Sequence, residues 1–458
     1  MALKKYLAVA GAMVFALQTA DAQTASPDAD LLKDALQQIQ RLANQVAAQE
    51  ARIRELEAGR SPRAPEPATN VTPAPTPATA PEPAILAPEP ITQPTPEPST
   101  ASADMGGHNM AIPGGPVLNI RGFFDFNFGV GSIANPLIFP TVSNGCAACG
   151  NPPTPAHNSF QAGELDLFLS SKLSNHLSFI SEIVFGSDTT NFFGIDIERY
   201  QLTYRANRYF SASIGRFHTS IGYYNTAYHH GNWFSTADGR PIMYLFEDSG
   251  GALPVHMVGV SLTGAVPGAE KLGLHWVAEM GNGRNSSPAS AQPVQNFYSD
   301  RNYKAVNLAV YIKPELVPGL QIGGSFYHDK LAPPGLDRVN QNIGSAYVVY
   351  FNSEWEFLTE GVLLSNRLER TSQLFQSPMA YTQVARKFGI YKPYFRYQYL
   401  NDRYNDPVNI LQGKYYGPSV GMRIDFAEYA AFKLQYNHLY QSRQLAGNGL
   451  DAQVAFTF

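Results

Sequence analysis

Charged side chains occupy every second position in several segments whose other positions are apolar. In residues 414–426, Arg423 and Asp425 alternate with Met422, Ile424 and Phe426. In an extended chain this spacing places the charges on one face. Charges of both signs on one face could line a water-filled passage and set up an electric field across it. The candidate lining residues are Arg121, Glu164, Asp166, Lys172, Glu182, Glu279, Glu360, Arg396, Arg423, Asp425, Lys433 and Gln435.

Four basic residues of this set lie in the first alternating segment and in three near the end of the chain. They are Arg121, Arg396, Arg423 and Lys433. Closure of the sheet into a barrel would bring these segments together, and the cations would then form a basic ladder along which anionic solutes move. The alternative is local charge pairing that only fills the wall.

The longest interval between alternating segments, residues 218–254, is rich in aromatic and titratable side chains. Its length suits a constriction loop folded into the bore of a barrel, and an external lid is the alternative. The candidate constriction residues are Tyr228, His229, His230, Trp233, Arg240, Glu247 and Asp248. Because the histidines and carboxylates show no tight ligand spacing, we expect no metal and no cofactor.

Two further groups could do chemistry. Cys146 and Cys149 form a CxxC motif without the βαβ context of a redox site, so in an oxidising compartment we expect a small loop disulfide. Ser220 near His218 is the only local pair that resembles a hydrolytic site, and no nucleophile motif surrounds it. We therefore expect no enzymatic activity.

The composition separates the first quarter of the 458-residue chain from the rest. All but two of the 25 Tyr, 27 Phe and 3 Trp residues follow residue 116, and only 15% of all residues are charged. The net charge is −4, and basic and acidic residues nearly balance after residue 103. Nucleic acid is therefore excluded as an expected partner.

From Val117 onward the pattern has period two, with one apolar and one polar face over about ten residues, as a transmembrane β-strand requires. The pattern predicts an all-β fold, a transmembrane antiparallel β-barrel of about 16 strands over residues 117–458. The predicted strands are 117–130, 160–173, 177–186, 195–205, 209–217, 255–264, 272–281, 304–312, 320–329, 343–351, 354–366, 379–388, 392–402, 414–426, 430–440 and 450–458.

The predicted connections alternate in length. They are long after odd-numbered strands, except the third, and short after even-numbered ones, as in outer-membrane barrels. A soluble β-sandwich has no reason to show this alternation. In hydrocarbon every backbone polar group must be paired, so 117–130 is predicted to pair with 450–458.

Three segments precede the barrel. Lys4, Lys5 and the apolar run 7–17 indicate a signal peptide over residues 1–22. Residues 23–60 contain a heptad seam typical of a short α-helical coiled coil, with a single helix packed on the barrel as the alternative. The seam leaves two or three helices open. The proline-rich residues 61–116 form a predicted disordered tether or linker.

The barrel pattern resembles Gram-negative sixteen-stranded porins. The final run from Leu450 to Phe458 resembles the strand that the barrel-assembly machinery recognises in that class. Residues 215–222 resemble the segment that leads into the third outer loop of phosphate-selective porin O/P-like proteins. A coiled coil ahead of the barrel resembles the trimeric DcaP-like porins. The barrel differs from phosphate-selective relatives because it has no basic excess.

Together these features predict an outer-membrane porin for passive diffusion of small polar or anionic solutes. The alternatives are a structural or adhesive barrel tethered to the cell wall and an outer-membrane hydrolase. The expected partners are outer-membrane lipid, lipopolysaccharide, the barrel-assembly machinery, peptidoglycan and further copies of the chain, with a homotrimer as the resemblance implies. The N-terminal segment is expected in the periplasm.

Overall fold

The computed structural model of the chain describes its barrel. The described residues are 116–131, 159–187, 193–228, 232–245, 251–284, 297–299, 301–333, 337–409, 413–442 and 446–458. The predicted signal peptide, coiled coil and tether up to residue 115 lie outside these ranges. So do Cys146, Cys149, His229, His230, Glu247 and Asp248.

Strands make up most of the described residues, and β8 (Ala305–Ile312) shows why the sequence forms them. Its exposed Val306, Leu308 and Val310 alternate with the buried Ala305 and Asn307. Such alternation suits a pleated strand, in which successive side chains point to opposite faces. The period-two pattern therefore predicts the strands and also which of their faces is covered.

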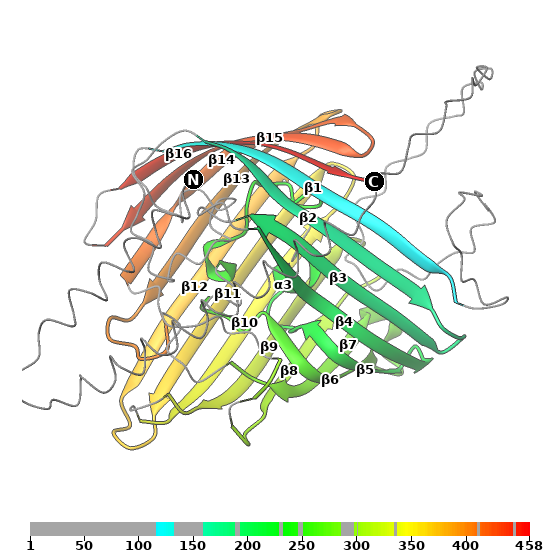
Figure 1. Cartoon of the computed structure of the whole chain (residues 1–458), viewed down its shortest axis with the longest axis vertical. Helices are drawn as coiled ribbons and strands as arrows, with labels where there is room; N and C mark the ends of the chain where they lie inside the picture. Colours follow the sequence, from blue (N-terminus) through cyan, green and yellow to red (C-terminus); the bar gives the residue numbers. More distant parts are fainter. Residues whose placement is uncertain are drawn as a thin grey trace, which may run out of the picture. The chain divides into compact units, whose positions relative to one another are not determined.

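Sixteen strands follow one another in chain order (Figure 1). They are β1 (Leu118–Gly131), β2 (Ser159–Lys172), β3 (Leu177–Ser187), β4 (Phe193–Asn207), β5 (Phe210–His218), β6 (His256–Ala265), β7 (Leu274–Asn282), β8 (Ala305–Ile312), β9 (Leu320–Leu331), β10 (Val339–Phe351), β11 (Trp355–Leu368), β12 (Leu374–Arg386), β13 (Tyr391–Asp402), β14 (Gly413–Ala427), β15 (Ala430–Gln441) and β16 (Gly447–Thr457). The short helices are α3 (Tyr224–Ala227), η1 (Ile242–Tyr244) and η3 (Glu270–Leu272). Among the described residues, no helix is long and apolar enough to cross a membrane.

The sheet closes on itself as predicted. Each strand pairs antiparallel with its neighbours in sequence, and β1 pairs with β16 in a register that places Phe124 opposite Phe456. Gly122 and Phe458 exchange two backbone hydrogen bonds of 2.9 and 3.0 Å at the end of this seam. A Cβ atom on Gly122 would lie 2.3 Å from the Phe458 ring, so a larger residue at this position would displace that ring.

The alternation of long and short connections is weaker than predicted. The intervals 132–158, 219–255 and 283–304 are long, but β10 and β12 begin earlier than predicted, which shortens their preceding connections to 332–338 and 369–373. The connections 266–273 and 313–319 follow even-numbered strands and were predicted to be short. They are nevertheless at least as long as 332–338 and 369–373, which follow odd-numbered strands. The three long intervals all follow odd-numbered strands.

Candidate functional site

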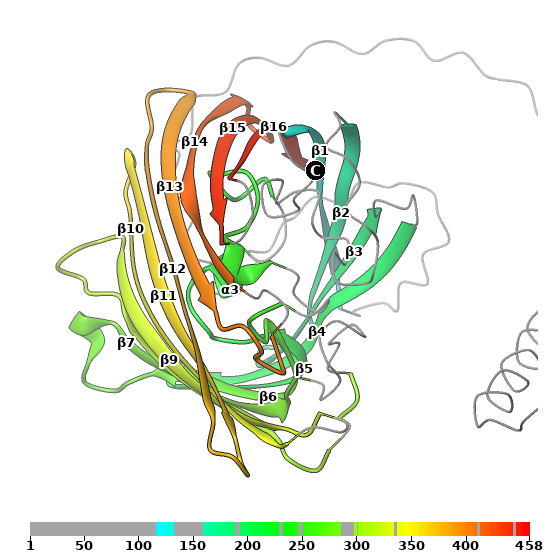
Figure 2. The same cartoon turned by 90° about the vertical axis from the view of Figure 1, so that its left-hand side faces the viewer.

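Residues 219–228 and 232–245, here called the inner segment, connect β5 towards β6 through the interior of the barrel. Ser220 Oγ donates to Glu279 on β7 at 2.8 Å, and Asn232 Nδ2 donates to Asp125 on β1 at 3.0 Å. Thr236 Oγ1 donates to a Glu356 carboxylate oxygen on β11 at 2.5 Å. A segment that contacts strands so far apart in a closed ring must lie inside the ring. Figure 2 shows α3 in the space that the strands enclose.

One carboxylate, Glu360 on β11, accepts four hydrogen bonds. Two come from the backbone N–H groups of Tyr223 and Tyr224, at 2.6 and 2.9 Å. The hydroxyls of Tyr244 and Tyr381 donate the other two, at 2.9 and 2.5 Å. Three of these four donors belong to the inner segment and the fourth to β12. Glu360 is 2% exposed, so its contacts are with protein groups and not with solvent.

Lys433 on β15 binds residues 232–237 of the inner segment. Its ammonium group donates to Ser235 Oγ at 3.1 Å and to Ala237 O at 3.4 Å, and also to Asn232 O. An ammonium group has three protons to donate. All three acceptors belong to the inner segment, and the Lys433 side chain is fully buried.

Two arginines, on β14 and on β13 beyond it, also hydrogen-bond the inner segment. Arg423 on β14, directly opposite Lys433 in the ladder, donates to Ser235 O at 2.9 Å. Arg396 on β13 donates to Gly239 O at 2.9 Å. Arg396, Arg423 and Lys433 therefore lie on three adjacent strands, and each of them hydrogen-bonds the inner segment.

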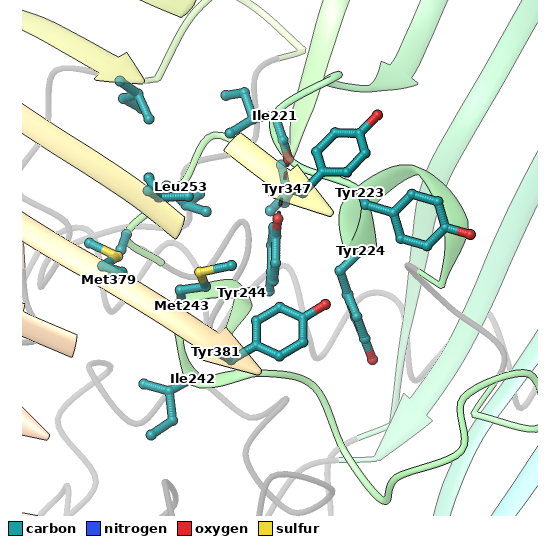
Figure 3. Packing of buried hydrophobic residues seen from close by; sticks show 14 of the residues in the cluster. Ile221, Tyr223, Tyr224, Ile242, Met243, Tyr244, Leu253, Tyr347, Met379 and Tyr381 are labelled. Atoms are coloured by element: carbon teal, nitrogen blue, oxygen red, sulfur yellow. Dashed lines mark hydrogen bonds between the residues drawn. The ribbon is translucent and has the colours of Figure 1, made fainter. Parts of the chain in front are cut away.

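An apolar cluster holds the inner segment between these polar contacts. Met243 and the nearby Leu253 pack with Met379 of β12 in this cluster (Figure 3). Leu358, Val362 and Leu364 of β11, Leu400 of β13 and Leu439 of β15 belong to the same cluster. Part of the interior face is thus apolar, whereas the sequence pattern predicted polar side chains turned inward.

Charged groups also gather where the segment leaves the wall. His218 ends β5 and His256 begins β6; they are opposite each other, with ring centroids 5.2 Å apart. His256 Nε2 lies 2.9 Å from a Glu198 carboxylate oxygen, and the Arg216 guanidinium lies 3.1 Å from His256 Nδ1. Because arginine can only donate, Nδ1 accepts and Nε2 carries the proton. These contacts fix the His256 tautomer at one end of the connection.

Burial alters the acid–base behaviour of the inner segment. It raises the pKa of the Tyr223, Tyr228 and Tyr244 hydroxyls well above the ordinary value, and the Glu360 carboxylate adds to this effect at Tyr244. These phenols therefore remain protonated. Burial also raises the pKa of Asp238 to about 6, although the positive charge of Lys433 acts in the opposite direction.

The lining residues predicted from the sequence differ in exposure. Arg121 and Lys172 are exposed, and Glu164 and Asp425 are half-buried. The remainder are buried, namely Asp166, Glu182, Glu279, Glu360, Arg396, Arg423, Lys433 and Gln435. Most of the predicted lining therefore faces protein groups in this structure.

The three described constriction candidates are Tyr228, Trp233 and Arg240. Tyr228 packs against Tyr224 with ring centroids 5.4 Å apart, and the Arg423 guanidinium lies 5.8 Å from the Trp233 ring centre. Arg240 is buried. Ser220, the residue of the minor hydrolase hypothesis, uses its hydroxyl to bind Glu279.

Sequence reasoning missed Asp125, Glu356 and Gly222. Asp125 and Glu356 occupy the polar faces of predicted strands, so the same alternation could have included them. Gly222 has φ of +75°, and a Cβ atom there would lie 2.3 Å from a Glu360 carboxylate oxygen and 2.1 Å from Tyr244 Oη. No sequence pattern signals that requirement, because it depends on contacts between distant residues.

Comparison with known proteins places this architecture among porins. No protein-family model matches the chain, and no curated protein matches it in sequence. In structure it is similar to an anion-selective porin from Comamonas acidovorans, with 10% identity and a TM-score of 0.53 over 75% of this chain and 100% of that one. It is also similar to the outer membrane channel DcaP of Acinetobacter baumannii, with 11% identity and a TM-score of 0.51 over 75% of this chain and 98% of that one. The chain therefore has the fold of outer-membrane porins, as the sequence resemblance predicted.

Proposed function

We propose that the barrel forms a water-filled channel in the bacterial outer membrane, through which small polar or anionic solutes diffuse passively. The observation that carries this proposal is a closed wall of sixteen strands with an interior segment bound across it. Closure of the sheet gives every backbone N–H and C=O group of the wall a hydrogen-bond partner in hydrocarbon. A barrel of this strand number leaves an aqueous interior. The apolar residues exposed on alternate strand positions suit contact with lipid.

The inner segment is the proposed constriction. It hydrogen-bonds β1, β7, β11, β13, β14 and β15, so it occupies part of the cross-section that these strands enclose. Solutes would pass beside it. This proposal includes Tyr228, Trp233 and Arg240, together with the predicted residues of the same loop outside the described ranges.

The charged residues divide into two proposed roles. Arg121 and Lys172 are exposed and suited to contact solutes directly. Arg396, Arg423 and Lys433 are buried against the inner segment and act through the segment that they hold. Arg396, Arg423 and Lys433, three of the four residues of the basic ladder, thus determine the width of the channel as well as its charge.

Swelling of proteoliposomes tests the channel proposal. Vesicles containing the purified protein should swell in isotonic solutions of small sugars, amino acids and organic acids, at rates that fall with solute size. Vesicles prepared with heat-denatured protein provide the control. Equal rates with native and denatured protein would refute passive diffusion.

The first quarter of the chain extends the proposal to the assembly of several copies. We propose that residues 23–60 hold a homotrimer together in the periplasm and that 61–116 link this coiled coil to the barrel. Contacts with lipopolysaccharide, the barrel-assembly machinery and peptidoglycan remain part of the same proposal. Deleting residues 28–58 should lower the mass of the complex in detergent, measured by light scattering, because helices of this length stabilise themselves mainly by association. An unchanged mass would contradict this role.

A further inference from the structure

We propose that Glu360 is a positioning residue, which fixes the inner segment in the interior and does not itself contact solute. This inference rests on the proposed constriction and adds the group that sets its position. The sequence pattern placed Glu360 among the lining residues, but the carboxylate is 2% exposed.

The hydrogen bonds of Glu360 use the full capacity of its carboxylate. A carboxylate offers about four lone-pair sites, and four donors occupy them. Oε2 accepts from Tyr223 N–H and the Tyr244 hydroxyl, and Oε1 accepts from Tyr224 N–H and the Tyr381 hydroxyl. Hydrogen bonds to an ionised group are about twice as strong as neutral ones. The carboxylate is thus satisfied by dipoles of the protein.

The position of the donors along the chain gives these bonds their effect. Tyr223 and Tyr224 lie near the start of the inner segment, and Tyr244 lies near the end of its described part. One carboxylate therefore ties both regions to β11, while the Tyr381 hydroxyl donates to the same carboxylate from β12. The rings of Tyr224 and Tyr244 stack with centroids 5.4 Å apart, which brings the two regions together beside Glu360.

The conformation of Gly222 is a separate observation that supports the contact between Glu360 and Tyr244. Its φ of +75° is a conformation that residues with a side chain adopt at a cost. A Cβ atom would collide with both Glu360 Oε2 and Tyr244 Oη. Glycine at position 222 therefore provides the space in which the Glu360 carboxylate and the Tyr244 hydroxyl form their hydrogen bond.

The test measures how often the inner segment leaves the wall. In a background with Cys146→Ser and Cys149→Ser, Met243→Cys places a thiol at a position that is 1% exposed in the native chain. The rate of its modification by a charged thiol reagent reports release of the segment. Glu360→Gln keeps the size of the side chain but exchanges one acceptor oxygen for an amide donor, which would face two other donors.

We expect Glu360→Gln to raise the modification rate about tenfold or more, which corresponds to about 1.4 kcal/mol. Open-channel current should become larger and noisier in the same variant. Glu354→Gln is the matched control, because Glu354 lies in the β10–β11 turn and its side chain is 59% exposed. This control should modify at the native rate.

Strand content by circular dichroism should stay unchanged in both variants, which separates release of the segment from loss of the barrel. If Glu360→Gln prevents folding, Gly222→Ala displaces the same contact without changing charge, and Tyr381→Phe removes a single donor. Native modification rates in the variants that fold would overturn the positioning role. Accelerated modification without channel activity in the native protein would instead refute the proposed function alone.

Discussion

At the scale of single residues, the ammonium group of Lys433 is one of the main attachments of the inner segment. Lys433→Met should remove this donor from the oxygen acceptors in Asn232, Ser235 and Ala237, at a cost of about 1–3 kcal/mol for each acceptor that stays buried without another donor. The Ser235 hydroxyl can still donate to one of the two carbonyl groups. We expect larger and noisier single-channel currents. Lys414→Met is the control, since Lys414 is exposed on β14. Identical current traces for the two variants would argue against attachment through Lys433.

Asp238 gives the inner segment a dependence on pH. Its pKa of about 6 in the folded chain is above the ordinary value of 3.8, because burial penalises the charged form. The folded state therefore binds the proton more tightly than the unfolded state, and its stabilisation is complete below 3.8 and is lost as pH rises through 6. We expect the segment to loosen, and current noise to rise, as the pH increases from about 4 to 6. Asp238→Asn should abolish this dependence, and an unchanged pH profile in that variant would assign it to another group.

Individual roles were harder to predict from the sequence than the faces of the strands. Alternation correctly grouped Arg423 with Asp425, and Glu360 with the polar positions of its strand. It could not show that Glu360 is covered, because the covering groups, Tyr223 and Tyr244, come from a distant connection. The period-two pattern shows on which face of the strand a side chain lies. What covers that side chain depends on tertiary contacts with distant parts of the chain.

At the scale of elements, β11 combines an exterior for lipid with an interior for packing. Leu363 is 44% exposed, whereas its neighbour Leu364 is fully buried in the cluster around Met243. Leu364→Ala should loosen the inner segment at a cost of about 2–5 kcal/mol, the usual range for such a cavity. Leu363→Ala should leave it attached. Recording open-channel noise for both variants checks the difference, and equal noise would show that the cluster does not hold the segment.

The elements themselves followed from the sequence with small errors of position. β10 begins at Val339 rather than residue 343, because Asn340, Gln341 and Asn342 interrupt the apolar pattern while their backbones pair with β9 and β11. β12 begins at Leu374, ahead of Pro378, where the prediction started after the proline. Backbone pairing therefore extends these strands beyond the residues in which apolar and polar side chains alternate.

At the scale of the whole barrel, the unexpected feature is the apolar core inside. The strand pattern predicted apolar side chains on the lipid face and polar ones on the interior face, yet Tyr347 of β10 and Tyr381 of β12 are buried in one interior cluster with Tyr223 and Tyr244 of the inner segment. An aromatic-rich composition alone cannot distinguish these two locations. The interior cluster makes the inner segment part of the folded barrel, attached by apolar packing as well as by hydrogen bonds.

The most direct test of a channel narrowed by the inner segment is single-channel recording in planar lipid bilayers. The native protein is compared with a variant in which a short Gly-Ser linker replaces residues 232–245. We predict discrete conductance steps for the native protein and several-fold larger steps for the variant, because a sixteen-stranded barrel without the segment leaves a wider aqueous interior. Absence of steps from the native protein, or steps of equal size from both proteins, would contradict this account.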